Sequence, residues 1–351
     1  MPAKFIYFIS FALALLISFV GTFLVARIAV RRKIMDYPDG RRKFHEQPTP
    51  TLGGMAIFGS FFLVTLTIGL LAGYLSSGNI PLRNMIGIWA GGLILMIGGY
   101  LDDKYQLPPQ YSILFPILAT LSIISSGIQA VSVHNPLTGN IVSVSSLLSV
   151  VIVFIWVMTM TYTTKFLDGM DGLVTGISGI AALVIFALSL TSQVRQPHTA
   201  LLAITFAGSL FGFLILNFHP AKIFLGEAGS TFTGFMLAVL AVISGGKIAT
   251  AVLVMGIPLL DMVWVILQRL FSKQSPFKGD RKHLHFKLLD LGFSQPQAVL
   301  FLYALTGIFG ATALLLQSLG KLVALGVLVL FTIALLILIF VLSKVRQKLN
   351  E

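Results

Sequence analysis

The chain has 351 residues, of which 56% are hydrophobic and only 10% are charged, and its formal net charge is +12. Soluble domains carry roughly 25% charged residues, so this composition excludes an ordinary soluble enzyme and favours a protein that crosses the membrane many times. The chain contains no cysteine, which excludes disulfides and thiolate metal sites. Its basic residues flank apolar segments, a pattern that is typical of membrane topology and argues against nucleic-acid binding.

The first apolar segment, residues 5–27, follows Lys4 and is longer than the roughly 7–15 apolar residues of a signal peptide, so it predicts a retained transmembrane helix. Similar segments recur along the chain. Because a spanning segment must satisfy its own backbone hydrogen bonds, they predict an all-α polytopic membrane bundle that forms one integral-membrane domain over residues 1–351. We expect eleven spans, or ten if Gly245 and Gly246 do not separate two of them. The expected spans are 5–27, 52–74, 84–101, 110–130, 144–164, 172–192, 199–218, 230–245, 248–269, 298–318 and 322–343.

The basic residues predict the orientation of these spans. With the N-terminus outside and the C-terminus in the cytoplasm, 19 of the 24 Lys and Arg residues face the cytoplasm, as the positive-inside rule requires. Eleven of the twelve acidic residues fall on the same side, and Asp261 lies in the cytoplasmic half of its span. We therefore expect a multi-pass protein of the plasma (inner) membrane whose polar chemistry faces the cytoplasm. The expected cytoplasmic loops are 28–51, 102–109, 165–171, 219–229 and 270–297.

The first two cytoplasmic segments carry a basic cluster and a pair of carboxylates. The segment DYPDGRRKFHEQPTPTLGG, residues 36–54, either only sets topology or binds phosphate. Its candidate phosphate ligands are Arg42, Lys43 and His45. In GGYLDDKYQLPP, Asp102 and Asp103 leave an apolar helix side by side, where they repel each other and lose hydration. This pair indicates a metal site or a general base, the alternative being a solvated helix end.

The next two segments also place carboxylates between apolar spans. In KFLDGMDGLV, Asp168 and Asp171 are three residues apart, and a helix there would put both on one face. Carboxylates in such a position are functional candidates, although Asp168 could instead cap a helix. In NFHPAKIFLGEAGSTF, Glu227 lies between glycines, just before a Ser-Thr pair that could cap the following span. A helix N-terminus of this kind can bind phosphate, whereas the alternative for Glu227 is a simple loop acid.

The last inner segment, SPFKGDRKHLHFKLLDLG, contains His283 and His285, which would share one side of an extended segment or lie on opposite sides of a helix. A solvated basic loop is the alternative. The chain has no H-E-x-x-H spacing, so zinc is not expected. Carboxylates beside Lys, Arg and His favour Mg²⁺ and phosphate chemistry, because Mg²⁺ takes oxygen ligands and shares its shell with substrate phosphates. The residues therefore predict a cytoplasm-facing Mg²⁺ site that handles a phosphorylated substrate.

Taken in order, these motifs resemble those of the polyprenyl-phosphate N-acetylhexosamine-1-phosphate transferases over nearly the whole chain. The blocks that match are DYPDGRRKFHEQPTPTLGG, the DD pair at 102–103, DGMDGL at 168–173, IFLGEAGS and DRKHLHFKLL. The D-R-x-H form of the last block favours the undecaprenyl-phosphate GlcNAc-1-phosphate branch over the pentapeptide transferases, which usually have a run of histidines. Four positions depart from the family pattern: Lys165 and Tyr162 replace asparagines, Glu227 replaces a metal-binding aspartate and Phe286 replaces a histidine.

The resemblance implies transfer of a HexNAc-1-phosphate, first of all GlcNAc-1-phosphate, from a UDP-sugar to undecaprenyl phosphate, with release of UMP. The product would feed cell-envelope glycan synthesis, and the cofactor would be Mg²⁺, with Mn²⁺ as an alternative. Asp102 would act as the base, by direct attack of the lipid phosphate or through a covalent aspartyl-phosphate. The implied catalytic residues are Asp102, Asp103, Asp168 and Asp171. The implied metal ligands are Glu227, Asp103 and Asp171. The implied substrate-binding residues are Arg42, Lys43, His45, Lys104, Lys165, Asn217, Arg281, His283 and His285.

Other functions remain open at this point. A phospho-MurNAc-pentapeptide transferase of the same family would share the motifs. A membrane transporter would place charges at mid-membrane and use broken helices in repeated halves, whereas only Asp261 lies well inside an expected span. A lipid-linked scaffold would bind a UDP-sugar without releasing UMP. The sequence also leaves open which UDP-HexNAc is the donor and whether the protein forms a homodimer.

Overall fold

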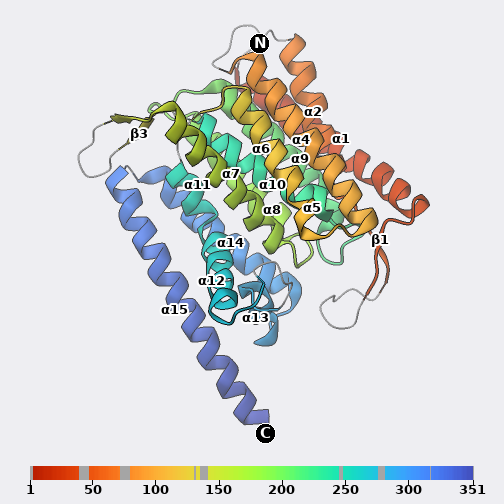
Figure 1. The fold of residues 1–351 in the computed structure, drawn as a ribbon, viewed down its shortest axis with the longest axis vertical. Helices are drawn as coiled ribbons and strands as arrows, with labels where there is room; N and C mark the ends of the chain where they lie inside the picture. The colour runs from red at the N-terminus through yellow and green to blue at the C-terminus, as the bar shows by residue number, and fades with distance from the viewer. Residues whose placement is uncertain are drawn as a thin grey trace.

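The computed structural model describes residues 3–38, 47–71, 80–129, 132–134, 141–244, 248–275, 281–316 and 318–350. These residues form a bundle of long helices with two short antiparallel hairpins, which confirms the predicted all-α polytopic fold (Figure 1). The helices are α1 (Ala3–Arg31), α2 (Gly53–Leu71), α4 (Leu82–Tyr105), α5 (Pro109–Ser112), α6 (Leu114–Ser125), α7 (Ser146–Leu167), α8 (Leu173–Ser189), α9 (Pro197–Asn217), α10 (Gly226–Ile243), α11 (Ile248–Val254), α12 (Gly256–Phe271), α13 (Leu284–Asp290), α14 (Gln295–Leu315) and α15 (Ser318–Asn350). The hairpins pair β1 (Met35–Asp36) with β2 (Thr49–Pro50), and β3 (Ser132–His134) with β4 (Ile141–Ser143).

Each expected span overlaps one helix or one pair of helices. Among the described residues, eight helices are long and apolar enough to cross a membrane, and the pair α11–α12 makes a ninth if it is one broken span. The segments Pro109–Ser125 and Leu173–Ser189 are apolar but shorter. The helices therefore agree with the expected pattern of apolar segments, while the number of eleven spans and the orientation of the termini stay predictions.

The expected span 248–269 is bent in the structure, because α11 and α12 meet at an angle of 79°. Pro258 explains the break: proline lacks a backbone N–H, and its ring clashes with the carbonyl four residues earlier, here that of Val254. Val254 is the last residue of α11. A hydropathy pattern contains no information about this clash, so it does not indicate the bend.

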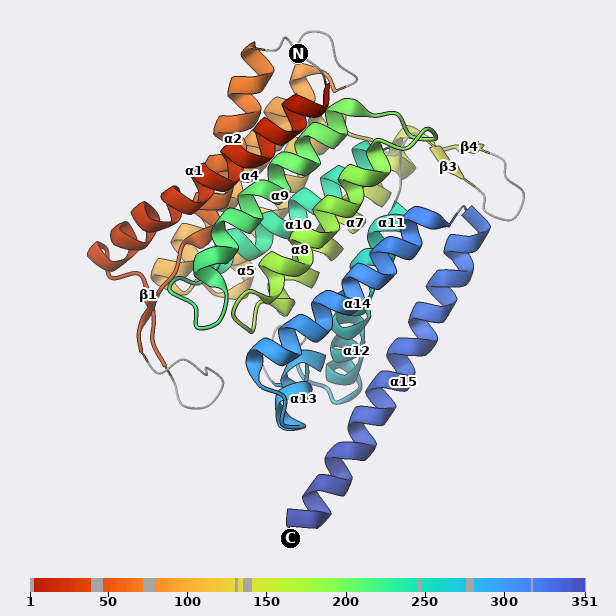
Figure 2. The ribbon, with the colours of Figure 1, turned by 180° about the vertical axis from the view of Figure 1, so that it is seen from behind.

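Helix α10 forms the centre of the bundle, and α1 and α15 lie at its edge. Within the most apolar 18-residue stretch of each helix, 83% of the residues are buried in α10, compared with 22% in α1 and in α15. Figure 2 shows α15 inclined away from the other helices, with the C-terminus at the opposite end of the molecule from the N-terminus. The exposed leucines and valines of α1 and α15 are consistent with helices that face lipid.

Small residues bring three helix ends together around the start of α10. A Cβ atom on Gly99 of α4 would clash with the backbone of Ala228, and one on Gly54 of α2 would clash with the backbone of Gly229. Such close approach of backbones is typical of membrane helices that pack through glycine and alanine. The C-terminal end of α4 and the N-terminal end of α2 are thereby held against the first turn of α10, where Glu227 lies.

Candidate active site

Carboxylates from the ends of α4 and α10 meet directly. The backbone N–H of Glu227, in the first turn of α10, donates a 3.1 Å hydrogen bond to Oδ1 of Asp103, near the end of α4. A negative charge at a helix N-terminus is stabilised by the free N–H groups and by the helix dipole. Residues 124 positions apart in the chain are thus joined at one end of the bundle.

Gly226 makes this approach sterically allowed. Its φ angle is +74°, and a Cβ atom at this position would lie 2.5 Å from Oδ2 of Asp103. Glycine adopts positive φ angles at little cost, whereas other residues are strained there. This Oδ2 oxygen of Asp103 is buried and has no hydrogen-bond partner in the structure. A buried carboxylate oxygen without a partner is costly, which indicates that a proton or a cation satisfies it.

The third member of the cluster is Lys165, in the last turn of α7. Its Nζ atom lies 2.6 Å from Oε1 of Glu227 and 3.4 Å from Oγ of Ser112. The same ammonium lies 5.6 Å from the ring centre of Tyr162, and its charge also acts on Asp102. Lys165 and Glu227, which both depart from the family pattern, are therefore a bonded pair.

Asp168 and Asp171 do not share a helix face, because neither of them lies in a helix. Helix α7 ends at Leu167 and α8 begins at Leu173, and the two aspartates lie in the turn between them. Gly172, with a φ of +74°, allows this turn, and its carbonyl accepts a 2.5 Å hydrogen bond from Tyr303. The sequence placed residues 165–171 between two expected spans, and a shared helix face was expected only if a helix formed there.

The two aspartates have different surroundings. Asp171 Oδ2 lies 2.8 Å from Nδ1 of His219 and accepts a 3.1 Å hydrogen bond from the backbone N–H of Ala221, so it holds the connection between α9 and α10. The Asp168 side chain reaches the surface but is surrounded by protein on most sides. This loss of hydration, together with the negative charges of Glu227 and Asp171, raises the pKa of Asp168 to about 8.

The histidines of the last motif lie beside the same turn. Nδ1 of His283 lies 2.8 Å from Oδ2 of Asp261, and Oδ1 of Asp261 accepts a 2.8 Å hydrogen bond from the N–H of Leu284. The rings of His283 and His285 are nearly parallel, with centres 5.7 Å apart. A Cβ atom on Gly169 would lie 2.5 Å from Nε2 of His285, so the second ring packs against the aspartate turn.

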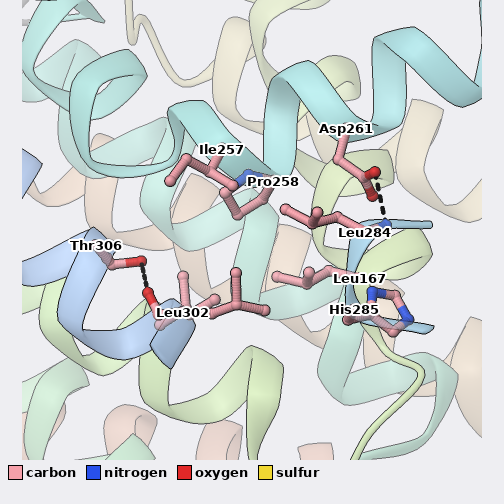
Figure 3. A pocket seen from close by; sticks show the side chains of 9 residues that line it. Leu167, Ile257, Pro258, Asp261, Leu284, His285, Leu302 and Thr306 are labelled. Atoms are coloured by element: carbon pink, nitrogen blue, oxygen red, sulfur yellow. Dashed lines mark hydrogen bonds between the residues drawn. The ribbon is translucent and has the colours of Figure 1, made fainter. Parts of the chain in front are cut away.

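His285 is a buried, neutral side chain. Burial lowers the pKa of His285 to about 3, and neither ring nitrogen has a hydrogen-bond partner. Its ring lines one end of a small cavity of about 10 Å³, and Figure 3 shows Asp261 bonded to the backbone of Leu284 at the same end. The other lining residues are Leu167, Ile177, Ile257, Pro258, Leu302 and Thr306. A cavity of this size holds at most a water molecule, so it is not a substrate site.

The remaining predicted residues lie away from this cluster or are used structurally. Asn217 is buried, accepts a hydrogen bond from Thr175 and donates one to the carbonyl of Ile223. Arg281 donates a 2.8 Å hydrogen bond to Asp290 of its own segment. Lys104 is exposed, and its ammonium lies 4.8 Å from the ring centre of Tyr105. Three predicted phosphate ligands lie outside the described residues: Arg42, Lys43 and His45.

Sequence reasoning missed His219 and the role of Asp261. His219 lies in the short segment between α9 and α10. Its position in a short loop expected on the cytoplasmic side, with the acidic residues, could have marked it as a candidate. Asp261 was recognised as an acid within an apolar span, but the sequence contained no sign that it pairs with His283. Both contacts join segments that only the fold brings together.

The side-chain atoms of this cluster show whether it is suited to a metal ion. Among the described residues, no group of three or more His, Asp or Glu side chains is placed so that it could hold a metal ion. However, Oδ2 of Asp103 is buried without a hydrogen-bond partner. The acidic side chains around it offer only carboxylate oxygens as metal ligands. Oxygen donors of this kind suit a hard divalent cation that keeps part of its shell for substrate or water. The donor set therefore fits such a cation at Asp103, whereas Glu227 is engaged by Lys165.

Comparisons with known proteins show which family the chain belongs to. Residues 85–245 match the model of a family described as glycosyl transferase family 4, a range that contains Asp102, Asp103, Asp168, Asp171 and Glu227. The chain is also 31% identical over 318 residues, 88% of its length, to the probable undecaprenyl-phosphate N-acetylglucosaminyl 1-phosphate transferase of Bacillus subtilis (strain 168), and the match covers 85% of that relative. The chain belongs to glycosyl transferase family 4. The resemblance inferred from the motifs is thereby confirmed.

Other relatives of this family have related names. The decaprenyl-phosphate N-acetylglucosaminephosphotransferase of Mycobacterium tuberculosis (strain ATCC 25618 / H37Rv) is 30% identical over 86% of this chain and 80% of its own length. The undecaprenyl-phosphate alpha-N-acetylglucosaminyl 1-phosphate transferase of Escherichia coli (strain K12) is 24% identical over 79% of this chain and 74% of its own length. The similarity to members of glycosyl transferase family 4 therefore extends over most of each chain.

Proposed function

We propose that this protein transfers GlcNAc-1-phosphate from UDP-GlcNAc to undecaprenyl phosphate and releases UMP. The observation that carries the proposal is the meeting of Asp103, Glu227 and Lys165, from the ends of three helices, at one end of a membrane bundle. One substrate is soluble and the other is anchored in the bilayer, so charged groups that act on both must lie at the membrane surface. The printed names of the relatives support the same acceptor and sugar classes.

The reaction forms one bond and breaks one bond at phosphorus. An oxygen of the lipid phosphate attacks the β-phosphorus of UDP-GlcNAc, and the bond from that phosphorus to the bridging oxygen breaks. The bridging oxygen leaves with UMP, and the product is undecaprenyl diphosphate linked to GlcNAc. In line with the prediction, Asp102 accepts the proton of a monoprotonated lipid phosphate, a role for which it lies at the end of α4 beside Asp103.

Asp103 and Glu227 are the residues that would hold Mg²⁺, or Mn²⁺, and the ion when bound neutralises negative charge on the diphosphate. The third residue expected to hold the ion, Asp171, contacts His219 and Ala221 through one of its two oxygens, Oδ2. Lys165 faces the same space and can bind phosphate oxygens through its ammonium. Asp168, at the surface of the cluster, orients the nucleotide.

The charge pattern supports a location in the plasma membrane with the site facing the cytoplasm, where nucleotide sugars are made. On this proposal, the lipid-linked sugar is an intermediate for a cell-envelope glycan. The α11–α12 bend and the buried Asp261 do not require ion transport, because Asp261 is bonded to His283 and to the backbone of Leu284.

Purified full-length protein tests the proposal directly. The protein is incubated in detergent with undecaprenyl phosphate, Mg²⁺ and a panel of UDP-sugars, and UMP and the lipid product are both measured. We expect equal amounts of the two products with UDP-GlcNAc, and none with Glu227→Ala protein or after EDTA treatment. Binding of UDP-sugars without UMP release would replace the proposal with a binding scaffold. Solute flux in proteoliposomes without nucleotide consumption would replace it with a transporter.

A further inference from the structure

Two residues that depart from the family pattern touch each other in the active-site cluster. Lys165 and Glu227 are 62 residues apart in the chain, and their side chains join across 2.6 Å while only 26% and 14% exposed. An asparagine at position 165 could not form this ion pair, because asparagine carries no charge. The pair therefore holds an ammonium against the carboxylate that was expected to bind the metal.

The ammonium and a divalent cation compete for the same carboxylate. Two cations close to one carboxylate repel each other, and this repulsion is stronger in a partly buried site than in water. The Lys165 charge also acts on Asp102, so the ammonium also repels a divalent cation that approaches Asp102. A divalent cation consequently binds Glu227 well only if the ammonium moves away.

Lys165 is held in a way that allows this movement. Besides Glu227, its ammonium has a long 3.4 Å contact to Ser112 and a 5.6 Å contact to the ring of Tyr162. A lysine side chain is unbranched and flexible, and its ammonium binds phosphate as a point charge. A diphosphate next to the cluster thus offers the ammonium a stronger partner than Ser112 or Tyr162.

We propose that Lys165 is a tethered cation that occupies Glu227 in the substrate-free enzyme and transfers to the diphosphate of the donor, so that the donor opens the site for the divalent cation. This inference rests on the proposed function for the identity of the donor. It makes donor and divalent cation bind with positive coupling, and the coupling is reciprocal by thermodynamic linkage. Substrate-free enzyme then binds divalent cations weakly.

Binding of Mn²⁺, measured by electron paramagnetic resonance on purified full-length protein in detergent, tests this inference without any transfer reaction. In the absence of nucleotide, Lys165→Asn protein should bind Mn²⁺ about tenfold or more tightly than wild type, because a charge repulsion has been removed. UDP-GlcNAc should tighten Mn²⁺ binding to wild type by about tenfold more than to the Lys165→Asn variant, because the diphosphate attracts the ion in both proteins but displaces an ammonium only in wild type. Lys165→Arg keeps the positive charge and should behave like wild type.

Two controls separate this effect from general changes. Lys222→Asn removes an exposed lysine from the segment between α9 and α10 and should leave Mn²⁺ affinity unchanged. Glu227→Gln should remove the tight binding gained by the Lys165→Asn variant, which locates the ion at this carboxylate. Thermal unfolding midpoints of all variants establish that they are folded.

Unchanged or weaker Mn²⁺ binding by folded Lys165→Asn protein overturns the inference, as does an equal gain in the Lys222→Asn control. Because nucleotide-free Mn²⁺ binding needs no turnover, a failure of the proposed transferase reaction leaves this readout intact. A positive Mn²⁺ result in a protein that releases no UMP would therefore support the tethered cation and reject only the assigned reaction.

Discussion

The backbone N–H of Glu227 donates to one oxygen of Asp103, while the other oxygen of the same carboxylate is buried without a partner. The first contact fixes the position of the carboxylate at the start of α10. The second oxygen can bind a proton or a cation. One oxygen of Asp103 therefore has a structural role, and the other is available for the reaction.

Replacement of Asp103 by asparagine should separate these tasks. Asn Oδ1 can still accept the N–H of Glu227, but the charge is lost, so we expect UMP release to fall by about 100-fold or more. The thermal unfolding midpoint in EDTA should stay the same or rise, because an unpaired buried carboxylate is removed. Activity close to that of wild type in folded Asp103→Asn protein would exclude Asp103 from the reaction.

Gly226→Ala should damage both stability and activity. The φ angle of +74° and a Cβ atom only 2.5 Å from Asp103 Oδ2 leave no room for a methyl group. We expect a loss of about 1–3 kcal/mol in the free energy of unfolding, measured by chemical denaturation, and a matching loss of UMP release. Gly307→Ala in α14 is the matched control, since a Cβ atom there meets nothing within 4 Å. Equal effects at both positions would show that the close approach is unimportant.

Asp261→Ala should destabilise the segment that carries the histidines. It leaves the N–H of Leu284 and Nδ1 of His283 buried without their partner, which costs about 1–3 kcal/mol in the free energy of unfolding. The comparison is Asp290→Ala, whose pair with Arg281 is exposed and contributes about 1 kcal/mol or less. If the two variants unfold at the same denaturant concentration, the Asp261 contacts do not hold this segment.

The raised pKa of Asp168 predicts a pH dependence of stability in EDTA. The ordinary value is 3.8 and the folded-state pKa is about 8, so the folded protein keeps a proton that the unfolded chain releases. The stability from this proton is fully present below about pH 4 and is lost as the pH rises through about 8. Asp168→Asn mimics the protonated form at every pH.

Thermal unfolding of both proteins checks this sign. The midpoint of Asp168→Asn minus that of wild type should grow as the pH increases from about 5 to about 8 and then level off. The growth should be modest, because the carboxylate reaches the surface and water screens its charge. A difference that is constant or that shrinks over this range would contradict the raised pKa.

Much of the architecture was predictable because local sequence controls it. Apolar segments of spanning length predicted all the long helices of the described chain, since a helix in lipid must satisfy its own backbone and expose apolar side chains. The placement of Asp102, Asp103 and Glu227 near helix ends followed from the same pattern. Local backbone effects decided two details that hydropathy does not contain: the bend before Pro258 and the turn around Asp168 and Asp171.

Composition and hydropathy were thus sufficient to establish a multi-pass helical protein with its carboxylates at the ends of apolar segments. The ordered motifs were sufficient for the family. Only the folded structure decided which distant groups pair: Lys165 with Glu227, Asp171 with His219 and Asp261 with His283. The reason is physical, because spanning length depends on neighbours in the chain, whereas a contact of 2.6–2.8 Å depends on how helices pack in three dimensions.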